Sequence, residues 1–313
     1  MSEEIRPQHL SEYLGQDQIR NSLALSIKAA LQRRETLDHV LLTGPPGLGK
    51  TTLAQIIARE MHTETHIAFA PSLKAASDLS RTLKQLNEGD VLFIDELHRL
   101  HPAMEECLYT AMEDFTAPVT TYQGSQVMIE LPRFTLVGAT TRPGLLTQPL
   151  RNRFGIIGQL DFYSEAHLIS ICQRSAEVLG LTIDYSGMKE IARRARGTPR
   201  VINRLLRRVG DFAMIHCKGE VIDQWIADAA LNFNGIDSLG LERVDRDYLQ
   251  LLVEKYNGGP VGLITLASTL NQEKDSLEEV TEPYLLRLGF IDRTPRGRVA
   301  TELAWKHLKG SKQ

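Results

Sequence analysis

The sequence predicts an α/β protein in three parts: a parallel-sheet domain over residues 1–163, a small helical domain over 164–235 and a winged helix over 236–313. Three observations predict this organisation. A glycine-rich loop stands between a short apolar run and a helical pattern, the apolar spacing turns helical from Ser164, and the last part contains three helical patterns followed by a hairpin. A length of 313 residues allows two or three domains.

The composition is that of a globular protein, with 42% hydrophobic and 24% charged residues. The net charge of −3 excludes a wholly basic surface, so any contact with nucleic acid must come from a local patch. The cysteines are three, widely spaced (Cys107, Cys172, Cys217), which excludes a zinc pattern and a disulfide framework. With no signal pattern and no apolar run of membrane length, we expect a cytoplasmic protein without a membrane partner.

Residues 44–51 read G-x-x-x-x-G-K-T, the pattern of a phosphate-binding P-loop. A strand-like run, His39 to Thr43, precedes the loop, and helical spacing follows it. Glycines let backbone N–H groups approach phosphate oxygens, and the helix N-terminus favours negative charge. We expect Lys50 to reach the β- and γ-phosphates and Thr51 to ligate Mg²⁺. An ordinary glycine turn is the alternative, but the complete motif and both flanks argue against it.

A second motif places two carboxylates at the end of a buried strand. Val91 to Ile94 is continuously apolar, as in parallel sheets, and runs into Asp95 and Glu96. We expect Asp95 to hold Mg²⁺ and Glu96 to polarise the attacking water. A capping pair is the alternative for such residues alone. His98 and His101 lack a third ligand nearby, so we expect surface or supporting residues there rather than a metal site.

Further polar residues stand where predicted elements end or begin. Thr140 ends another buried strand and is placed to sense the γ-phosphate or the attacking water. Two arginines, Arg151 and Arg153, stand beside a Phe-Gly turn, where an arginine is suited to facing the nucleotide of a next subunit. Arg200 starts a helix after Gly-Thr-Pro and is suited to pointing at the phosphates. For several other arginines between residues 193 and 208, the pattern predicts a solvated helix face.

Two segments leave alternatives open. Ile5 and Arg6 are either a frayed end or a cover over a bound base. Residues 119–131 read as a hairpin, with strands 119–122 and 127–131, whose Tyr122, Val127 and Ile129 either pack on the domain or serve a partner.

The last part predicts three helices and a hairpin with a basic tip, the order of a winged helix. Apolar positions, Val280 among them, mark the buried face of the third helix. That helix also carries four acids, Asp275, Glu278, Glu279 and Glu282, so it should not lie deep in a DNA groove. We expect the wing arginines to contact DNA phosphates with little sequence dependence and strong salt dependence: Arg293, Arg296 and Arg298. A protein-binding winged helix is the alternative.

In this order the motifs resemble those of the AAA+ ATPases, and most closely the bacterial motors of Holliday-junction branch migration. The resemblance covers almost the whole chain. It rests on Gly44 to Thr52, Phe93 to Glu96, Ala111 to Asp114, Gly138 to Arg142, Arg153 to Gly155, Ala192 to Arg200 and Arg293 to Arg298.

The resemblance implies ATP and Mg²⁺ as cofactors. It makes Thr140 sensor one, Arg200 sensor two and Arg153 a trans-acting arginine finger. It has Ile5 and Arg6 flank the adenine, and Arg293 and Arg298 hold the DNA backbone. The implied nucleotide contacts are Ile5, Arg6, Gly47, Gly49, Lys50, Thr51, Thr52, Glu113, Asp114, Phe115, Arg153, Tyr163 and Arg200.

The resemblance also implies partners. Members form homo-hexameric rings around duplex DNA, act in recombination and repair, and are loaded by RuvA, which docks on the hairpin matching residues 119–131; RuvC joins in a larger complex. Two other functions remain open. A clamp loader or other AAA+ remodeller does not need the basic wing, and a non-motor ATP-switched DNA-binding regulator does not need Glu96 and Arg153, which both serve hydrolysis.

Overall fold

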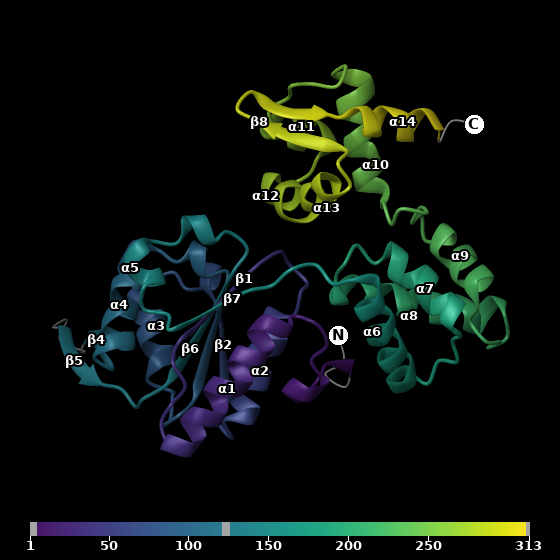
Figure 1. Cartoon of the computed structure of the whole chain (residues 1–313). Helices are drawn as coiled ribbons and strands as arrows, with labels where there is room; N and C mark the ends of the chain where they lie inside the picture. Colours follow the sequence, from purple (N-terminus) through teal and green to yellow (C-terminus); the bar gives the residue numbers. More distant parts are fainter. Residues whose placement is uncertain (1–4, 121–125, 311–313) are drawn as a thin grey trace. The chain divides into compact units, whose positions relative to one another are not determined.

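The computed structural model describes residues 5–120 and 126–310 (Figure 1). The chain divides into two compact units, Met1–Tyr163 and Ser164–Gln313.

The first unit is built on a parallel sheet of five strands in the order β2-β3-β6-β1-β7, which confirms the predicted fold class. Its strands are β1 (Val40–Thr43), β2 (Thr65–Phe69), β3 (Val91–Asp95), β6 (Thr135–Thr140) and β7 (Ile156–Gln159). The sequence pattern did not predict β7. Glycines at 155 and 158 flank its only two isoleucines, and it is an edge strand with Ile157 exposed.

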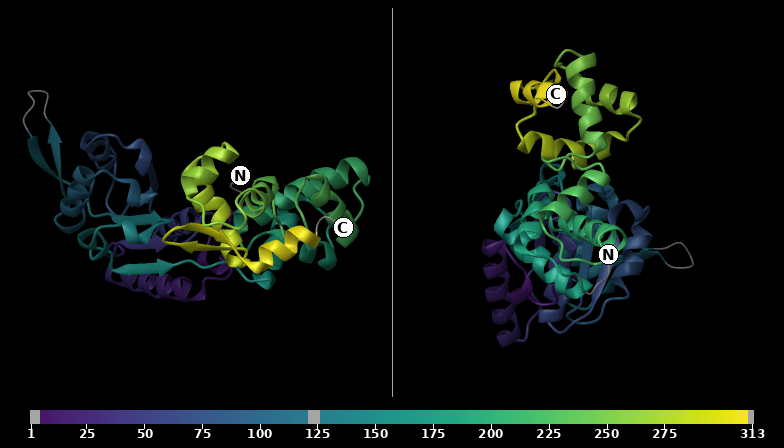
Figure 2. Two further views of the ribbon diagram at one scale, coloured as in Figure 1. Left: turned by 90° about the horizontal axis from the view of Figure 1, so that it is seen from above. Right: turned by 90° about the vertical axis from the view of Figure 1, so that its right-hand side faces the viewer.

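Helices cover both faces of this sheet (Figure 2). On one face lie α1 (Asp17–Arg33) and α2 (Lys50–Glu60). A Cβ on Gly158 would lie 2.5 Å from Ile19 of α1, so glycine permits this close packing. On the other face Leu41, Leu92, Ile94 and Leu136 join a core with the remaining helices. These are α3 (Ala76–Leu83), α4 (Pro102–Glu113) and α5 (Gln148–Arg151), with the 3₁₀ turns η3 (Ala70–Ser72), η4 (Leu97–Arg99) and η5 (Pro143–Leu145). A further 3₁₀ turn, η2 (Leu10–Glu12), contacts α2.

A hairpin, β4 (Thr116–Thr120) and β5 (Gln126–Glu130), follows α4. β4 begins earlier than the predicted 119, because Phe115 turns the chain at φ +50° directly after the helix. Ile129 packs against the domain core, whereas Val127 is exposed. Tyr122 and the predicted turn at 123–125 lie outside the described residues.

His39, at the entry to β1, accepts a hydrogen bond from the Leu136 N–H at Nδ1 (2.9 Å) and donates from Nε2 to the Met112 carbonyl (3.2 Å). These bonds require the neutral ring. Burial is the main cause that lowers the pKa of His39 below its ordinary value of 6.5.

The free energy of unfolding is therefore expected to decrease as the pH falls below about 6.5, because the unfolded chain then binds a proton that folded His39 still excludes. Above that pH the contribution is complete. Urea unfolding between pH 5 and 8 should show a flatter pH dependence for His39→Gln than for the unaltered chain. His62→Asn, at an exposed position, is the control and should keep the slope.

The second unit begins with four helices: α6 (Glu165–Leu179), α7 (Tyr185–Arg194), α8 (Pro199–His216) and α9 (Gln224–Phe233). Each has a side-chain N-cap, from Ser164, Asp184, Thr198 and Asp223, that accepts the backbone N–H three residues on. These caps explain why the helical pattern starts at residue 164 and restarts after each loop.

A winged helix follows, as predicted. Its elements are α10 (Arg243–Gln250), η6 (Leu251–Lys255), α11 (Leu263–Leu270), α12 (Lys274–Ser276), η7 (Leu277–Thr281), α13 (Glu282–Arg287), β8 (Ile291–Thr294), β9 (Gly297–Ala300) and α14 (Glu302–Gly310). The prediction that Val280 is buried is wrong. Residues 277–281 form a π-helical turn, which holds more residues per turn than an α-helix and so brings Thr281 rather than Val280 to the core.

Two of the arginines between residues 193 and 208 are not on a solvated face. The Arg194 side chain is 1% exposed and binds Glu190, Asp228, Asn232 and the Ile236 carbonyl. Arg196 is 10% exposed and pairs with Asp245 at 2.5 Å. Their partners are up to 49 residues away, so the local charge pattern does not reveal them.

Because Arg194 is a buried charge that joins α7, α9 and the following loop, Arg194→Met should lower the free energy of unfolding by about 3–5 kcal/mol. Arg193→Met is the matched control: Arg193 binds the same Glu190 but is 50% exposed, so its loss should cost about 1 kcal/mol or less. Urea unfolding, with hydrogen exchange of α7–α9 amides to localise the change, measures both. Equal losses would contradict this account.

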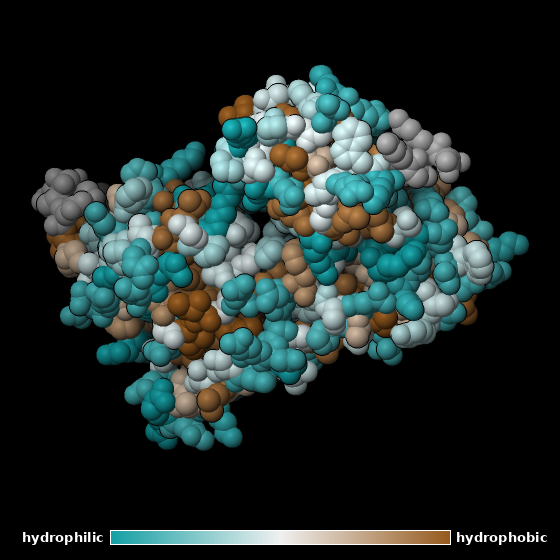
Figure 3. All heavy atoms as spheres, turned by 45° about the horizontal axis from the view of Figure 1, so that its top comes forward, coloured by the Kyte–Doolittle hydropathy of each residue, from teal (hydrophilic) through white to brown (hydrophobic). Residues whose placement is uncertain are grey.

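Hydrophilic residues predominate on the face shown in Figure 3, with hydrophobic residues in small groups between them. In the helices α8 and α9, however, Ile215, Trp225 and Phe233 are each more than 70% exposed. Apolar groups of this size on a surface are suited to contact with another protein surface. Within the described ranges, no helix combines the length and apolarity needed to cross a membrane.

Candidate nucleotide site and DNA-contact surface

The loop between β1 and α2 depends on its glycines. Gly44, Gly47 and Gly49 have φ of +134°, +82° and +102°, a region that other residues rarely adopt. A Cβ on Gly44 would lie 2.4 Å from the Leu160 carbonyl oxygen, and one on Gly49 would lie 2.8 Å from the Tyr13 hydroxyl. The loop backbone is thus held in a single path by its neighbours.

Lys50 opens α2 and is held on the loop itself. Its Nζ donates to the carbonyls of Gly44 (2.7 Å) and Pro45 (2.9 Å), and only 7% of the residue is exposed. Thr51 and Thr52 follow in the same half-buried turn, which carries no acidic residue. Glycine at the N-cap leaves the first N–H groups of α2 without a side-chain cap, so this end of the helix suits a phosphate.

Two buried tyrosines form hydrogen bonds with the loop. The hydroxyls of Tyr13 and Tyr163 each donate to the Leu48 carbonyl at 3.3 Å. Burial, reinforced by Tyr163, raises the pKa of Tyr13, so its hydroxyl stays protonated. The structure thus places Tyr163 at the loop, while its predicted contact with the nucleotide stays a prediction. Sequence reasoning missed Tyr13, because nothing in its neighbourhood distinguishes it from an ordinary core aromatic residue.

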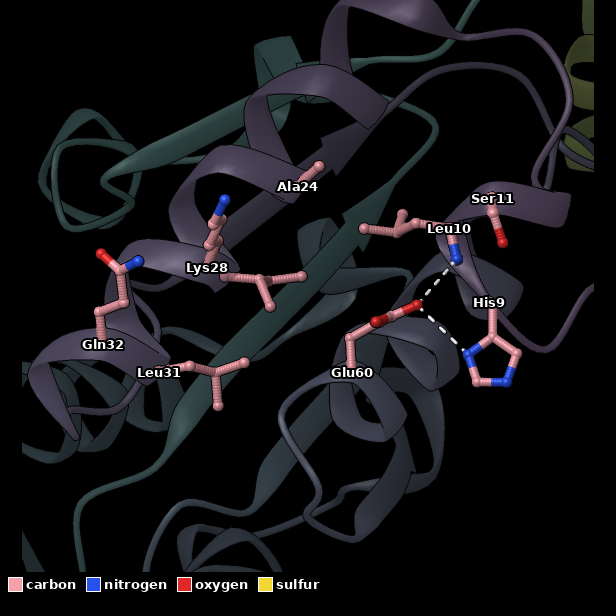
Figure 4. Close-up of a pocket in the computed structure, with 9 residues that line it drawn as sticks. His9, Leu10, Ser11, Ala24, Lys28, Leu31, Gln32 and Glu60 are labelled. Carbon is pink, nitrogen blue, oxygen red and sulfur yellow. Dashed lines mark hydrogen bonds and ion pairs between the residues drawn. The ribbon is translucent and has the colours of Figure 1, made fainter.

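The N-terminal segment packs along α2. Ile5 is 3% exposed, and Arg6 donates to Gln55 of α2 at 3.3 Å, so the alternative of a frayed end is wrong for these residues. Further along, Glu60 accepts the Leu10 N–H at 3.0 Å and lies 3.4 Å from His9 (Figure 4). The cavity of about 660 Å³ beside them lies at the far end of α2 from the glycine loop.

Asp95 ends β3 and Glu96 follows it, beside the end of the neighbouring β6 that carries Thr140. Glu96 has φ +53°, a conformation that costs energy for a non-glycine residue and is common at functional sites. Its N–H donates to Asp95 (3.0 Å), and its carboxylate accepts from the Thr141 hydroxyl (3.2 Å). The fully buried Thr140 contacts His98, whose side chain is 3% exposed.

The residues present fit a magnesium ion bound together with a nucleotide. Thr51 offers one hydroxyl and Asp95 one carboxylate at the same edge of the sheet, and Mg²⁺ usually combines one or two such ligands with phosphate oxygens and water. Across the part of the chain that the structure describes, no group of three His, Cys, Asp or Glu residues forms a metal site of its own.

The other predicted nucleotide contacts of this unit lie elsewhere. Arg153 precedes β7, whose first residue pairs with the first residue of β1, and Phe115 packs against His39 at the entry to β1. Glu113 binds Arg153 at 3.0 Å, and Asp114 is exposed beside it. These residues therefore occupy the amino edge of the parallel sheet, whereas the glycine loop follows the carboxyl end of β1. The structure does not bring them to the loop of their own chain.

In the second unit Arg200 is exposed in the first turn of α8.

The wing arginines are held by a buried acid. Glu282 is 0% exposed; it accepts from Arg293 (2.8 Å), from Arg298 (2.9 Å) and from the Tyr248 hydroxyl (2.9 Å). The expectation that Glu282 is an acid facing the phosphates is therefore wrong, because it neutralises arginines inside the domain. Arg293 remains 41% exposed and Arg298 17%. Arg296, at the tip of the wing, is exposed.

Three family models match consecutive parts of the chain. The Holliday junction DNA helicase RuvB P-loop domain matches residues 5–160, the RuvB AAA lid domain matches 163–237, and the RuvB C-terminal winged helix domain matches 238–309. Together they cover almost its whole length.

Individual relatives agree with these models. The Holliday junction branch migration complex subunit RuvB of Rubrobacter xylanophilus is 51% identical over 307 residues, which span 97% of this chain and 86% of the relative. The Thermotoga maritima RuvB Holliday junction branch migration motor superposes with a TM-score of 0.90 at 48% identity, covering 98% of this chain and 99% of that one. A lysine-to-arginine variant of it gives 0.91 at 48% identity, with 97% and 98% covered.

Proposed function

The chain belongs to the RuvB family of Holliday junction DNA helicases, and we propose that it acts with RuvA as a homo-hexameric ring that draws duplex DNA through the junction. It is an ATP-driven motor of branch migration. The observation that carries this conclusion is the match of all three domains in order, in a chain whose glycine loop, acid pair and Thr140 meet at one edge of the sheet. Membership of this family excludes the two alternatives, a clamp loader and a non-motor regulator.

Each residue at this edge has a proposed role in ATP hydrolysis. When ATP binds, Lys50 moves its hydrogen bonds from the loop carbonyls to the β- and γ-phosphates. The N–H groups of the loop and of α2 bind the phosphate oxygens. Glu96 orients and polarises the attacking water, and Thr140 donates a hydrogen bond to that water or to the γ-phosphate. Thr51 and Asp95 would hold Mg²⁺, which supplies charge neutralisation on the phosphates. Ile5, Arg6 and Tyr163 border the base, and Arg200 acts as the second sensor.

Two observations support a ring. Arg153 stands at the amino edge of the sheet with Glu113, Asp114 and Phe115, so it is available to a nucleotide on a neighbouring chain rather than to its own. The exposed apolar residues of α8 and α9 offer a surface for contact between subunits.

For DNA binding we propose the wing. Arg293 and Arg298 present their remaining N–H groups to the backbone from a fixed position on Glu282, and Arg296 reaches a phosphate from the tip. Because these contacts go to phosphates, binding should depend on salt rather than sequence.

Arg296→Ala should weaken binding to duplex DNA and reduce the slope of log K against log [salt] by about 0.9, without loss of stability. Arg298→Ala should weaken binding in the same way and also lower the free energy of unfolding by about 1–3 kcal/mol, because Glu282 loses one of its buried partners. Fluorescence anisotropy and urea unfolding separate the two effects. A stable Arg298→Ala variant would contradict the anchoring by Glu282.

The remaining assignments are proposed from the family. RuvA docks on the β4–β5 hairpin, RuvC joins in a larger complex, and the assembly acts in the cytoplasm. Incubation with RuvA, ATP and Mg²⁺ is expected to convert a synthetic four-way junction into duplex products. Omitting ATP or chelating Mg²⁺ should stop the conversion; conversion without ATP would refute the motor.

A further inference from the structure

His98 lies between two residues of the proposed hydrolysis site and has no role in the functions assigned so far. Its Nδ1 atom is 2.9 Å from Thr140 Oγ1 and 3.4 Å from Glu96 Oε2. The imidazole reaches these atoms from the turn that follows β3, and only 3% of its side chain is exposed to solvent.

The two distances assign the proton on the ring. An ionised Glu96 carboxylate can only accept hydrogen bonds, so a lone pair on Nδ1 would repel it. With the proton on Nδ1, the ring donates to Thr140 Oγ1 and attracts Glu96 Oε2 as a longer second acceptor. One N–H group thus links the hydroxyl to the carboxylate.

The same bond decides what Thr140 can do. A threonine hydroxyl has two lone pairs and one proton. The Arg142 N–H donates to Thr140 Oγ1 at 3.0 Å, and His98 fills the second lone pair. The hydroxyl is then left with only its proton to offer. Phosphate oxygens are acceptors, so a hydroxyl fixed as a donor suits the sensor of a γ-phosphate.

We propose that His98 is a positioning residue for ATP hydrolysis, which fixes the Thr140 hydroxyl as a donor and holds the Glu96 carboxylate at a set distance from it. His98 touches neither nucleotide nor water; it acts through Thr140 and Glu96. This inference rests on the proposed roles of Glu96 as base and Thr140 as sensor.

Three substitutions at His98 test it in the full-length chain. In His98→Asn the amide nitrogen stands where Nδ1 stands, whereas in His98→Gln it stands where Nε2 does, and His98→Leu removes both. DNA-stimulated ATP hydrolysis should give a kcat within about threefold of the unaltered chain for Asn, and about tenfold lower for Gln and Leu, with little change in the KM for ATP. If His98→Leu does not fold, the Asn and Gln pair, which keeps a polar side chain, carries the test.

His101→Asn is the matched control. His101 is an exposed N-cap of α4, a role that Asn performs equally well, so this variant should keep full activity. A double variant supplies a readout that a merely structural role would not move. Because His98 acts through the Thr140 hydroxyl, His98→Gln should cost much less in a Thr140→Val background than alone.

Normal kcat in His98→Gln and His98→Leu would overturn the proposal, as would equal losses in the Asn and Gln variants or losses that multiply independently with Thr140→Val. These failures are distinct from failure of the proposed function, which would appear as undiminished turnover in Glu96→Gln.

Discussion

Arg153→Ala is expected to lower DNA-stimulated ATP hydrolysis on the order of 10³-fold while leaving nucleotide binding nearly unchanged. An arginine that stabilises charge in the transition state of phosphoryl transfer contributes about 10³–10⁵ in kcat. Arg153 lies at the amino edge of the sheet, where two contacts orient it for this role. Glu113 binds it at 3.0 Å, and the ring of Tyr109 lies 4.3 Å from its guanidinium carbon. Steady-state hydrolysis and binding of a fluorescent ATP analogue measure the two effects.

Mixed rings test whether the arginine acts in trans. Lys50→Ala subunits cannot hold the phosphates but keep Arg153, whereas Arg153→Ala subunits keep an intact glycine loop. Mixing the two inactive proteins should therefore restore hydrolysis at sites that combine a good loop with a good arginine. Arg151→Ala, at the end of the preceding short helix α5, is the control and should stay active. If no mixing ratio raises activity above that of either variant, Arg153 does not act on a neighbour.

The second large effect is expected for Glu96→Gln, which should lower kcat about 10²–10⁴-fold, the usual contribution of a general base. Glutamine keeps the size of the side chain and can still accept from Thr141, but it cannot accept a proton from water. ATP should therefore bind with nearly unchanged affinity and remain unhydrolysed. Single-turnover hydrolysis, with equilibrium binding in parallel, separates the two steps.

Glu106→Gln, at an exposed position of α4, is the matched control for the loss of one negative charge and should keep full turnover. Turnover of Glu96→Gln within tenfold of the unaltered chain would show that another group serves as the base.

The elements that could be predicted from sequence are those whose chemistry is local. The glycine loop, its lysine and the acid pair at the end of β3 each occupy a few consecutive residues, and parallel strands bring their carboxyl ends together without further information. The winged helix likewise follows from its order of helices and hairpin. Tertiary partners cannot be predicted in this way. Glu282 looks like a surface acid until Arg293 and Arg298 are placed around it.

The sequence pattern also does not predict where the backbone departs from regular geometry. A helical period of 3.6 residues assigns Val280 to the core, but the π-helical turn shifts the buried face by one position. β7 has too few apolar residues to stand out, and it is a strand because β1 pairs with it. Tyr13 supports the glycine loop from 35 residues away, and His98 reaches Thr140 across 42. Only the folded chain shows that these residues meet.

In the proposed function, ATP hydrolysis by this chain drives branch migration. The measurement that tests it most directly is the conversion of a synthetic four-way junction into duplex products, followed on a gel with and without RuvA, with Lys50→Ala as the blank. We expect ATP-dependent conversion that RuvA stimulates and that Lys50→Ala abolishes. DNA-stimulated ATP hydrolysis without conversion, even with RuvA present, would contradict it.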